Sequence, residues 1–369
     1  MQKKTVAVFF GGNSNEHEVS VITGMFAVNL LRNSSYKVVP VYLPRAGGMV
    51  TGDMRGVHDF RSGANRKFTP VILSDGALVH QTKKKRVAQI DVALNCCHGG
   101  AGEDGTLSAL LAWSGIPNAS PPTAVSAVFM DKTLTKHAAR GLQIPVLEGV
   151  DVREKEWKGD SEGVLARVGA LGYPVVVKPA RLGSSIGVSV VHSKEELPAA
   201  LSLAFRLDDG ALLEKYLSGK RDLNCAACRI GGQTRVSEVE EAFSGEDILT
   251  FSEKYEGNAR RSALPADIPA ETAKKIQEYT RLLYESFHTR GVVRADFLLS
   301  EGELYFNELN TVPGSLSCYL FGETLLDARN FLVALVEEAL SSPPKGKETL
   351  TTGILEEGVF SGSKGSKRR

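Results

Sequence analysis

Residues 294–314 constrain the fold of this chain more than any other stretch, because they place acidic side chains where two strands have to meet. Alternating apolar runs flank the sequence E-G-E at 301–303, a pattern that predicts a β-hairpin turning at Gly302. Opposed residues of an antiparallel pair share a face, as do residues two apart on one strand. That face would carry four polar residues, with Arg294 opposite Asn310 and Asp296 opposite Glu308.

Three of these side chains offer hard oxygen ligands. A buried face that carries Asp296, Glu308 and Asn310 needs a compensating cation. Carboxylate and amide oxygens without His or Cys suit Mg²⁺, which usually keeps several waters and completes its shell with substrate phosphates. The alternative interpretation is a solvated hairpin face that binds nothing.

The length and composition predict a multidomain globular protein with almost no net charge. Its 369 residues predict about two to three domains, and 42% hydrophobic and 24% charged residues are typical of globular proteins. Lys and Arg number 44 against 43 Asp and Glu, so no net charge attracts nucleic acid or an anionic membrane. Any phosphate binding must therefore be local.

The apolar runs and the cysteines indicate in which cellular compartment the protein is expected. No run is long enough to cross a bilayer, and the start, M-Q-K-K-T-V-A-V-F-F-G-G, breaks at glycines too early for a secretory signal, so we expect a cytoplasmic protein. The five cysteines lie mostly in apolar runs, which favours reduced, packed thiols. Redox or metal chemistry at the C-A-A-C sequence 225–228 is the alternative.

Changes of pattern divide the chain into four parts. Residues 1–122 alternate strands and helices, which predicts a three-layer α/β domain over a mostly parallel sheet. Residues 123–215 predict a compact α+β lobe, and residues 216–342 a second lobe that contains the acidic hairpin. Residues 343–369 read as a basic, mobile tail.

Two segments of the first lobe suggest nucleotide contacts. Lys178 ends a buried strand before the sequence R-L-G-S-S-I-G, where a compact charge and loop amides could bind one phosphate. The loop is not a Walker A motif, because it lacks Gly-Lys-Ser/Thr and leads into a strand, and a flexible hairpin tip is the alternative. The strand at 214–217, E-K-Y-L, could offer its backbone to a purine edge, or could be an ordinary edge strand.

Taken in order, these motifs resemble a known family. Lys132, Lys178, the glycine-rich hairpin, E-K-Y-L, R-A-D and N-E-L-N resemble the ATP-grasp fold, whose two α+β lobes clamp ATP. The sequences G-G-N-S-N-E-H-E-V-S, H-G-G-A-G-E-D-G-T, M-D-K, V-V-K-P-A-R-L-G-S-S-I-G, E-K-Y and N-T-V-P-G-S resemble the D-alanine:D-alanine ligases. The resemblance runs from about residue 6 to residue 319 and implies an N-terminal three-layer α/β domain followed by a two-lobed ATP-grasp.

The resemblance implies an ATP-dependent ligase that makes D-alanyl-D-alanine for peptidoglycan through a D-alanyl phosphate, with ATP and two Mg²⁺ (or Mn²⁺) ions. Glu16 would hold the ammonium of the first D-alanine with Ser184 and Tyr255, beside His98. Arg294 and the amide of Gly314 would stabilise the oxyanion, and Asp296, Glu308 and Asn310 would bind the metals. The residues implied for ATP are Lys132, Lys178, Glu214, Lys215, Leu217, Asp222, Lys254 and Asn307.

Each assignment has an ordinary alternative. Glu16 could favour the positive end of its helix, and His98 could be a satisfied buried histidine. Tyr255 could pack within its loop, and Lys132 could be a surface charge. The loops around 183–187 and 252–263 are the candidates for a lid. A homodimer is also expected, although no residue pattern indicates one.

The sequence departs from the family at two places. One extra residue precedes Asp222, the candidate ribose contact, and Tyr319 occupies the place of an expected serine near the second substrate, with Ser315 and Ser317 nearby. The E-K-Y sequence favours D-alanine or D-serine over D-lactate, and D-alanine is the prediction. A D-alanine:D-serine ligase and a non-catalytic ATP-binding module remain alternatives, whereas the missing G-x-G-x-x-G argues against a dehydrogenase.

Overall fold

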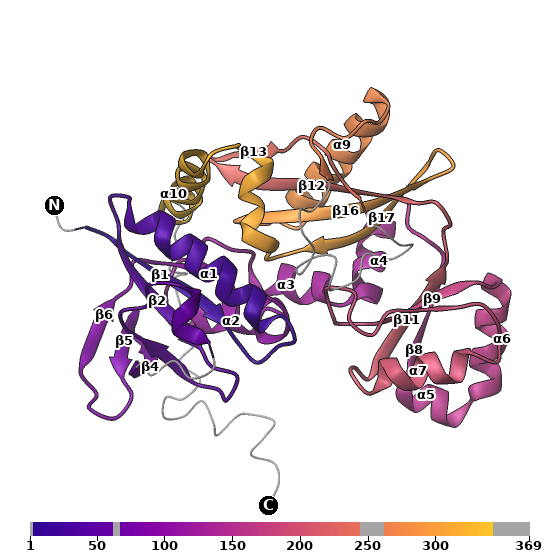
Figure 1. Cartoon of the computed structure of the whole chain (residues 1–369), viewed down its shortest axis with the longest axis horizontal. Coiled ribbons are helices and arrows are strands. Elements are labelled where there is room, and N and C mark those ends of the chain that lie inside the picture. The colour runs from indigo at the N-terminus through magenta and orange to yellow at the C-terminus, as the bar shows by residue number, and fades with distance from the viewer. Residues whose placement is uncertain (1–2, 62–66, 244–261, 342–369) are drawn as a thin grey trace, which may run out of the picture.

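Three sheets lie side by side in the molecule (Figure 1). The computed structural model describes residues 3–61, 67–243 and 262–341. The N-terminal sheet lies at the left of the figure, the sheet with the acidic hairpin in the centre, and the smallest sheet at the right. All five cysteines belong to the described part, where they are buried and unbridged, as predicted.

The N-terminal sheet is only partly parallel, so the prediction of a mostly parallel sheet is wrong. Strand β1 pairs in parallel with β2 and β7, but β2 to β6 form an antiparallel series. The polar stretch after β2 contains the short strand β3, which has no clear sequence signal and runs antiparallel to β2. The strands are β1 Thr5–Gly11, β2 Lys37–Leu43, β3 Met49–Thr51, β4 Thr69–Ser74, β5 Ala77–His80, β6 Arg86–Gln89 and β7 Val92–Asn95.

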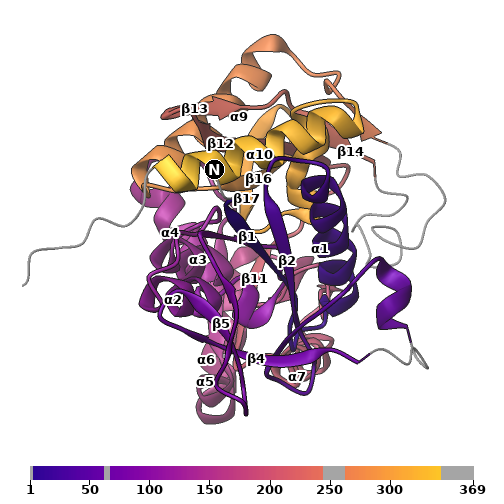
Figure 2. The same cartoon turned by 90° about the vertical axis from the view of Figure 1, so that its left-hand side faces the viewer.

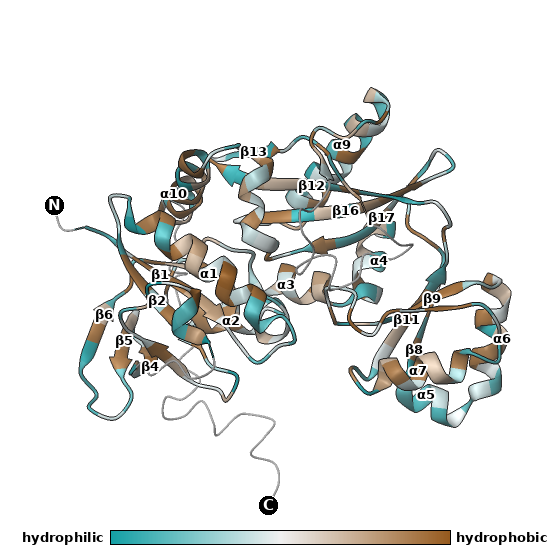
Figure 3. Ribbon diagram, viewed as in Figure 1, coloured by the Kyte–Doolittle hydropathy of each residue, from teal (hydrophilic) through white to brown (hydrophobic). Residues whose placement is uncertain are grey.

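Helices cover both faces of this sheet, which confirms the three layers. Val6, Val8 and Phe10 of β1 pack in one core cluster with α1 and α10, whereas Ala7 and Phe9 pack in another with α2. This alternation is why β1 is hydrophobic throughout, as its brown colour shows in Figure 3. Figure 2 shows α1 beside β1 and β2, with α10 crossing above them. The helices are α1 His17–Arg32, α2 Thr106–Trp113 and α10 Leu325–Ser341, with 3-10 turns at Val57–Phe60 and Gly100–Gly102.

The smallest sheet is a four-stranded antiparallel layer in the order β10-β9-β11-β8. One face, with Val175 and Val177 of β9 and Leu213 of β11, packs under helices. The opposite face carries Lys178 and Glu214, because alternate residues point to opposite sides. The elements are β8 Gly149–Arg153, α5 Glu154–Gly159, α6 Ser161–Leu171, β9 Val175–Pro179, β10 Ser189–Val191, α7 Leu197–Phe205 and β11 Gly210–Lys215.

The central sheet has the order β15-β14-β12-β16-β17, with β13 paired to β12. Val125 and Phe129 of α3 and Ala139 of α4 pack in the core of this sheet, rather than under the smallest one. The domain bounds at 122, 215 and 342 stay a prediction. The elements are α3 Thr123–Met130, α4 Lys132–Gly141, β12 Arg221–Ile230, β13 Gln233–Val236, β14 Glu240–Ala242, β15 Ser262–Ala263, α9 Ala270–Ser286, β16 Val292–Ser300, β17 Glu303–Asn310 and the 3-10 turn η3 Gly314–Leu320.

The acidic hairpin has the predicted pairing at its polar end, but reaches it by another route. Glu301 and Gly302 both have positive φ and form a two-residue turn, so Ser300 pairs with Glu303. A bulge between Asp296 and Phe297 then shifts the register by one residue and restores the predicted pairs. Arg294 therefore lies opposite Asn310, and Asp296 opposite Glu308.

The bulge also places the side chain of Asn307 on the polar face of the hairpin. Phe306 and Leu309 of β17 lie three residues apart, yet both are buried in the same core cluster. The two residues between them, Asn307 and Glu308, therefore both lie on the other, polar face. Regular alternation would have placed only one of them there.

Within the described residues, none of the helices has the length and apolar character needed to span a bilayer.

Candidate active site

A bidentate ion pair lies at the polar end of the hairpin. Arg294 Nε and Nη2 donate to the two carboxylate oxygens of Asp296 at 2.7 and 2.8 Å. Asn310 Nδ2 donates to Asp296 Oδ2 at 2.9 Å. Burial opposes the charge on Arg294, but Asp296 outweighs it and raises the pKa of Arg294 well above its usual value. The guanidinium is therefore a fixed positive charge.

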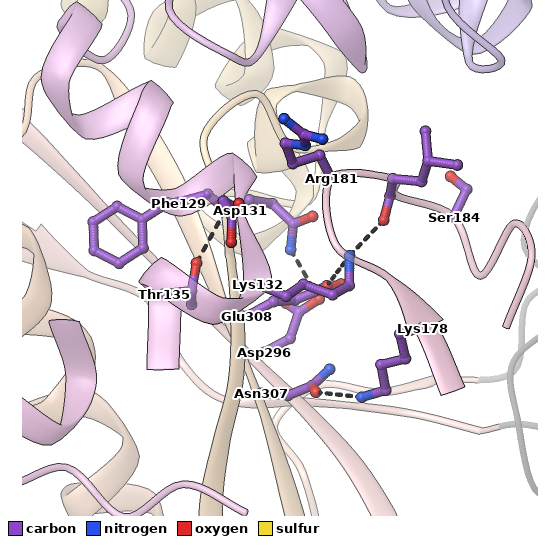
Figure 4. Close-up of polar contacts among 12 residues, drawn as sticks. Phe129, Asp131, Lys132, Thr135, Lys178, Arg181, Ser184, Asp296, Asn307 and Glu308 are labelled. Carbon is purple, nitrogen blue, oxygen red and sulfur yellow. Dashed lines mark hydrogen bonds and ion pairs between the residues drawn. The ribbon is translucent and has the colours of Figure 1, made fainter. Parts of the chain in front are cut away.

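A lysine faces the hairpin from the start of α4 (Figure 4). Asp131 begins that helix by accepting bonds from the amides of Thr133 and Leu134. Lys132 Nζ lies 3.8 Å from Glu308 Oε2 and donates to the backbone oxygen of Leu182 in the glycine-rich loop. Lys132 thus contacts both the acidic hairpin and the glycine-rich loop, which the sequence predicts to belong to one site.

A cluster around Lys178 lies between the central sheet and the smallest sheet. Lys178 Nζ donates to Glu214 Oε2 at 2.7 Å and to Asn307 Oδ1 at 3.2 Å, and Figure 4 shows the second contact. Burial would raise the pKa of Glu214, but the lysines around it lower the pKa to about 2. The bulge therefore brings Asn307 to the same lysine that Glu214 contacts.

One member of this cluster was missed by the sequence reasoning. Lys136 Nζ lies 2.9 Å from Glu214 Oε1 and donates to the backbone oxygen of Phe306 at 3.1 Å. Lys136 lies one helical turn after Lys132, so both point to the same side of α4. That spacing was a usable signal.

Glu16 and Ser184 meet, as the sequence predicted. The Ser184 hydroxyl donates to Glu16 Oε1, across the gap between the N-terminal domain and the glycine-rich loop. A Cβ at Gly99 or Gly183 would come within 2.9 or 2.8 Å of Glu16 Oε2, so a side chain at either position would displace the carboxylate. A pocket of about 210 Å³ lies here, and its lining includes Ser14, Glu16, Arg45, Gly99, Arg181 and Gly183.

Two bridges that the sequence reasoning missed tie this pocket to the loop after β17. Thr23 Oγ1 bonds His98 Nε2 at 2.8 Å and accepts from the amide of Ser315 at 3.3 Å. Glu103 accepts from the amides of Gly99 at 2.8 Å and Val312 at 3.0 Å. Burial and the nearby charge of Glu16 raise the pKa of Glu103 to about 8. These bonds fix the position of the pocket relative to the loop after β17.

His98 is buried, and burial lowers the pKa of its imidazole to about 4. The unfolded chain binds this proton near its usual pKa of 6.5, so the free energy of unfolding should fall as the pH is lowered from about 6.5 to about 4. The full loss is on the order of 3 kcal/mol. Urea unfolding of wild type and His98→Gln at pH 7 and pH 5 checks this: the variant should lose less. Equal losses in both proteins would contradict it.

The turn after Gly314 carries the predicted second-substrate residues. Ser315 and Ser317 adopt left-handed backbone angles, which are uncommon for residues other than glycine. Ser317 is fully buried, and its hydroxyl has no hydrogen-bond partner among the described residues. Tyr319 donates its hydroxyl to Glu240 Oε2 at 2.9 Å. A tyrosine–glutamate pair therefore occupies the place where a serine was expected.

The remaining predicted residues lie at the margin of the site or outside the described residues. Lys215 is exposed at the end of β11, on the opposite face from Glu214, and Leu217 follows it. Asp222 pairs with Lys220 at 2.5 Å. Lys254 and Tyr255 lie outside the described residues.

The hairpin face has the donor chemistry for a divalent cation. Asp296, Glu308 and Asn310 supply hard oxygens from two adjacent strands, as Mg²⁺ requires. Among the described residues, no three His, Cys, Asp or Glu side chains gather as a metal cluster, so a cation here would need the amide oxygen of Asn310 as its third protein ligand. The set fits a hard ion that takes further ligands from its substrate.

Two family models and several relatives match most of this chain. Residues 5–121 match the model described as D-ala D-ala ligase N-terminus, and residues 139–338 match the D-ala D-ala ligase C-terminus. A D-alanine–D-alanine ligase of Thermosipho africanus is 31% identical over 95% of this chain and 98% of its own, and one of Chlorobium phaeovibrioides is 34% identical over 85% and 90%.

Solved structures resemble this chain in overall fold. A D-Ala:D-Ser ligase from Enterococcus faecalis superposes with a TM-score of 0.77 at 28% identity, covering 91% of this chain and all (100%) of its own. A D-alanine-D-alanine ligase from Helicobacter pylori has a TM-score of 0.75 at 28% identity, covering 93% of this chain and 100% of its own. The two lobes of this chain are thus an ATP-grasp fold.

With both parts of the chain matched and relatives aligned over most of its length, the chain belongs to the D-alanine–D-alanine ligase family.

Proposed function

We propose that this protein joins two molecules of D-alanine at the expense of ATP, giving D-alanyl-D-alanine for peptidoglycan precursors. The observation that carries the proposal is the meeting of Glu16 with Ser184 beside the hairpin face of Arg294, Asp296 and Glu308. The first pair suits a small ammonium compound, and the second group suits a phosphoryl transfer.

The reaction has two covalent steps. A carboxylate oxygen of the first D-alanine attacks the γ-phosphorus of ATP, and ADP leaves. The amine of the second D-alanine then attacks the acyl carbon of the D-alanyl phosphate, loses a proton to solvent, and expels phosphate with the former carboxylate oxygen. Water must be kept out, because it would hydrolyse the acyl phosphate.

The residues divide this work by their charge. Glu16, oriented by Ser184, would hold the ammonium of the first D-alanine. Lys132 and Lys178 would bind phosphate oxygens, since both ammonium groups lie at the junction of the two lobes. Arg294 would stabilise the alkoxide of the tetrahedral intermediate, together with the amide of Gly314.

A divalent cation, held by Asp296, Glu308 and Asn310, would neutralise charge on the phosphates. Two Mg²⁺ ions, or Mn²⁺ in their place, are proposed from the resemblance and from the hard oxygen ligands. The assignments of Lys215, Leu217 and Asp222 to the nucleotide, and of Lys254 and Tyr255 to phosphate and first substrate, also stay proposals. A cytoplasmic homodimer is proposed as well, and light scattering of the purified protein tests its mass.

Product analysis tests the activity. Purified protein with Mg²⁺, ATP and D-alanine should release one ADP and one phosphate for each dipeptide formed. A folded protein that binds ATP but forms no dipeptide would contradict the proposal and would support a non-catalytic ATP-binding module.

D-serine is the second candidate for the amine-donating substrate, because hydrogen-bonding groups stand near its expected place. Tyr319 and Asn224 both bond Glu240 Oε2, at 2.9 and 3.0 Å. A hydroxyl on the second substrate could join this cluster. Competition between equal amounts of D-alanine, D-serine and D-lactate, followed by mass spectrometry of the products, decides between them.

Tyr319→Ser should change this selection. The substitution removes the bond to Glu240 and opens space beside the turn, so the ratio of mixed to symmetrical dipeptide should shift by roughly three- to tenfold, while the KM for ATP stays within about twofold. Tyr279→Ser, on α9 away from this turn, is the matched control. An unchanged product ratio would remove Tyr319 from the second-substrate site.

A further inference from the structure

Lys136 is buried beside the proposed nucleotide site, yet no family motif assigned it a role. Its side chain is 3% exposed, and its ammonium lies 2.9 Å from Glu214 Oε1. It also donates to the backbone oxygen of Phe306 at 3.1 Å, just before the bulge at Asn307. One lysine thus contacts both sheets that form the two lobes.

The other oxygen of Glu214 is taken by a different lysine. Lys178 Nζ donates to Glu214 Oε2 at 2.7 Å, so a single carboxylate is shared between two ammonium groups. The carboxylate is 1% exposed, which limits screening by water. Two positive charges and one negative charge leave this cluster with one positive charge.

Among residues 3–61, 67–243 and 262–341, the neighbouring acids contact other cations rather than this cluster. Glu308 lies 3.8 Å from Lys132, and Asp296 is held by both guanidinium nitrogens of Arg294. Each hairpin acid thus lies next to another cation, although Glu308 also attracts Lys136 and Lys178 electrostatically. The surplus charge of the Glu214 cluster is available to an anion.

We propose that Lys136 is a positioning residue for nucleotide phosphates, acting through Glu214. By neutralising the acid from its far side, it keeps Lys178 from being fully paired with Glu214. The ammonium of Lys178 can then turn to a phosphate without leaving a buried carboxylate uncompensated. The inference rests on the proposed function only in taking ATP as the nucleotide that binds here.

The proposal predicts that loss of Lys136 weakens binding of the phosphates but not binding of the base. In Lys136→Met, Glu214 and Lys178 would form a closed neutral pair, and a phosphate would have to compete with the carboxylate. ATP should bind about tenfold more weakly, because one charge near the phosphates is lost in a buried site. Adenosine carries no phosphate, so its affinity should stay within about twofold of wild type.

A double substitution sharpens this test. Lys136→Met with Glu214→Gln removes one charge of each sign, so the cluster regains its surplus positive charge on Lys178. The ratio of adenosine to ATP dissociation constants should fall about tenfold in the single lysine variant and return toward the wild-type ratio in the double variant. The ratio cancels any loss of base contact by Glu214.

Isothermal titration with ATP plus Mg²⁺, and separately with adenosine, measures these ratios. Lys158→Met on α5, an exposed lysine paired with Glu154, controls for the loss of one charge. Should Lys136→Met not fold, Glu214→Gln alone serves, since it raises the surplus charge and should increase the ratio.

Several results would overturn the inference. An unchanged ratio in Lys136→Met, or in Glu214→Gln where that variant serves, means that the buried lysine does not act on phosphates, and so does a double variant that stays at the single-variant ratio. Wild-type protein that binds no ATP also overturns it. Wild-type protein that binds ATP but makes no dipeptide refutes the proposed activity and leaves the binding ratios to decide on Lys136.

Discussion

Asp296→Asn should lower kcat for dipeptide formation on the order of 100-fold or more, with little change in the fold. The carboxylate of Asp296 would hold a divalent cation and also orients Arg294 through two bonds of 2.7 and 2.8 Å. Asparagine keeps the shape but loses the charge that both partners need. Steady-state assays across a range of Mg²⁺ concentrations check the loss.

The same variant distinguishes a metal ligand from a structural residue. Its far-ultraviolet circular dichroism should match that of wild type, while more Mg²⁺ should be needed for half-maximal rate. Asp151→Asn, an exposed position on β8, should behave as wild type in both measurements. Unchanged turnover in Asp296→Asn would refute the metal role of the hairpin.

Arg294→Lys should lower kcat by about 100-fold, although the charge is kept. Lysine cannot reproduce the fork that binds both oxygens of Asp296, so the donor for the tetrahedral alkoxide is lost or misplaced. The KM for ATP should change by less than about threefold, because the effect belongs to the transition state. Single-turnover kinetics with D-alanine check the step.

Its control is Arg281→Lys, a surface residue on α9 paired with Glu285, where the exchange should have no measurable effect. If Arg294→Lys instead weakened ATP binding in proportion to its loss of rate, the guanidinium would serve the nucleotide rather than the alkoxide.

The hairpin register was predicted correctly at its polar end because two local errors cancelled. The sequence pattern implied a turn centred on Gly302, whereas the turn has two residues and the bulge near Asn307 adds one back. A bulge follows from the three-residue spacing of the buried Phe306 and Leu309, which strict alternation does not consider.

Long-range partners explain what the sequence could not supply. Lys136 had a local signal, its helical spacing from Lys132, but its partner Glu214 lies on a distant strand. Thr23 and Glu103 act only because two loops meet in space. Local patterns predict elements and faces, and tertiary packing decides which faces meet.

The prediction of a mostly parallel N-terminal sheet was wrong for a related reason. Alternating strands and helices at both ends of the domain favour parallel pairing, and β1 does pair in parallel with β2 and β7. The short strand β3 lies in a polar stretch that shows no alternation, so the reversal it causes was not visible.

Transfer of an oxygen isotope tests the central claim most directly. With D-alanine labelled by ¹⁸O in its carboxylate, ATP and Mg²⁺, the account predicts that each phosphate released carries one labelled oxygen, because the carboxylate oxygen attacks the γ-phosphorus and leaves with it. Mass spectrometry of the phosphate reads this out. Unlabelled phosphate, formed alongside ADP, would mean that water attacks ATP and would contradict the acyl phosphate mechanism.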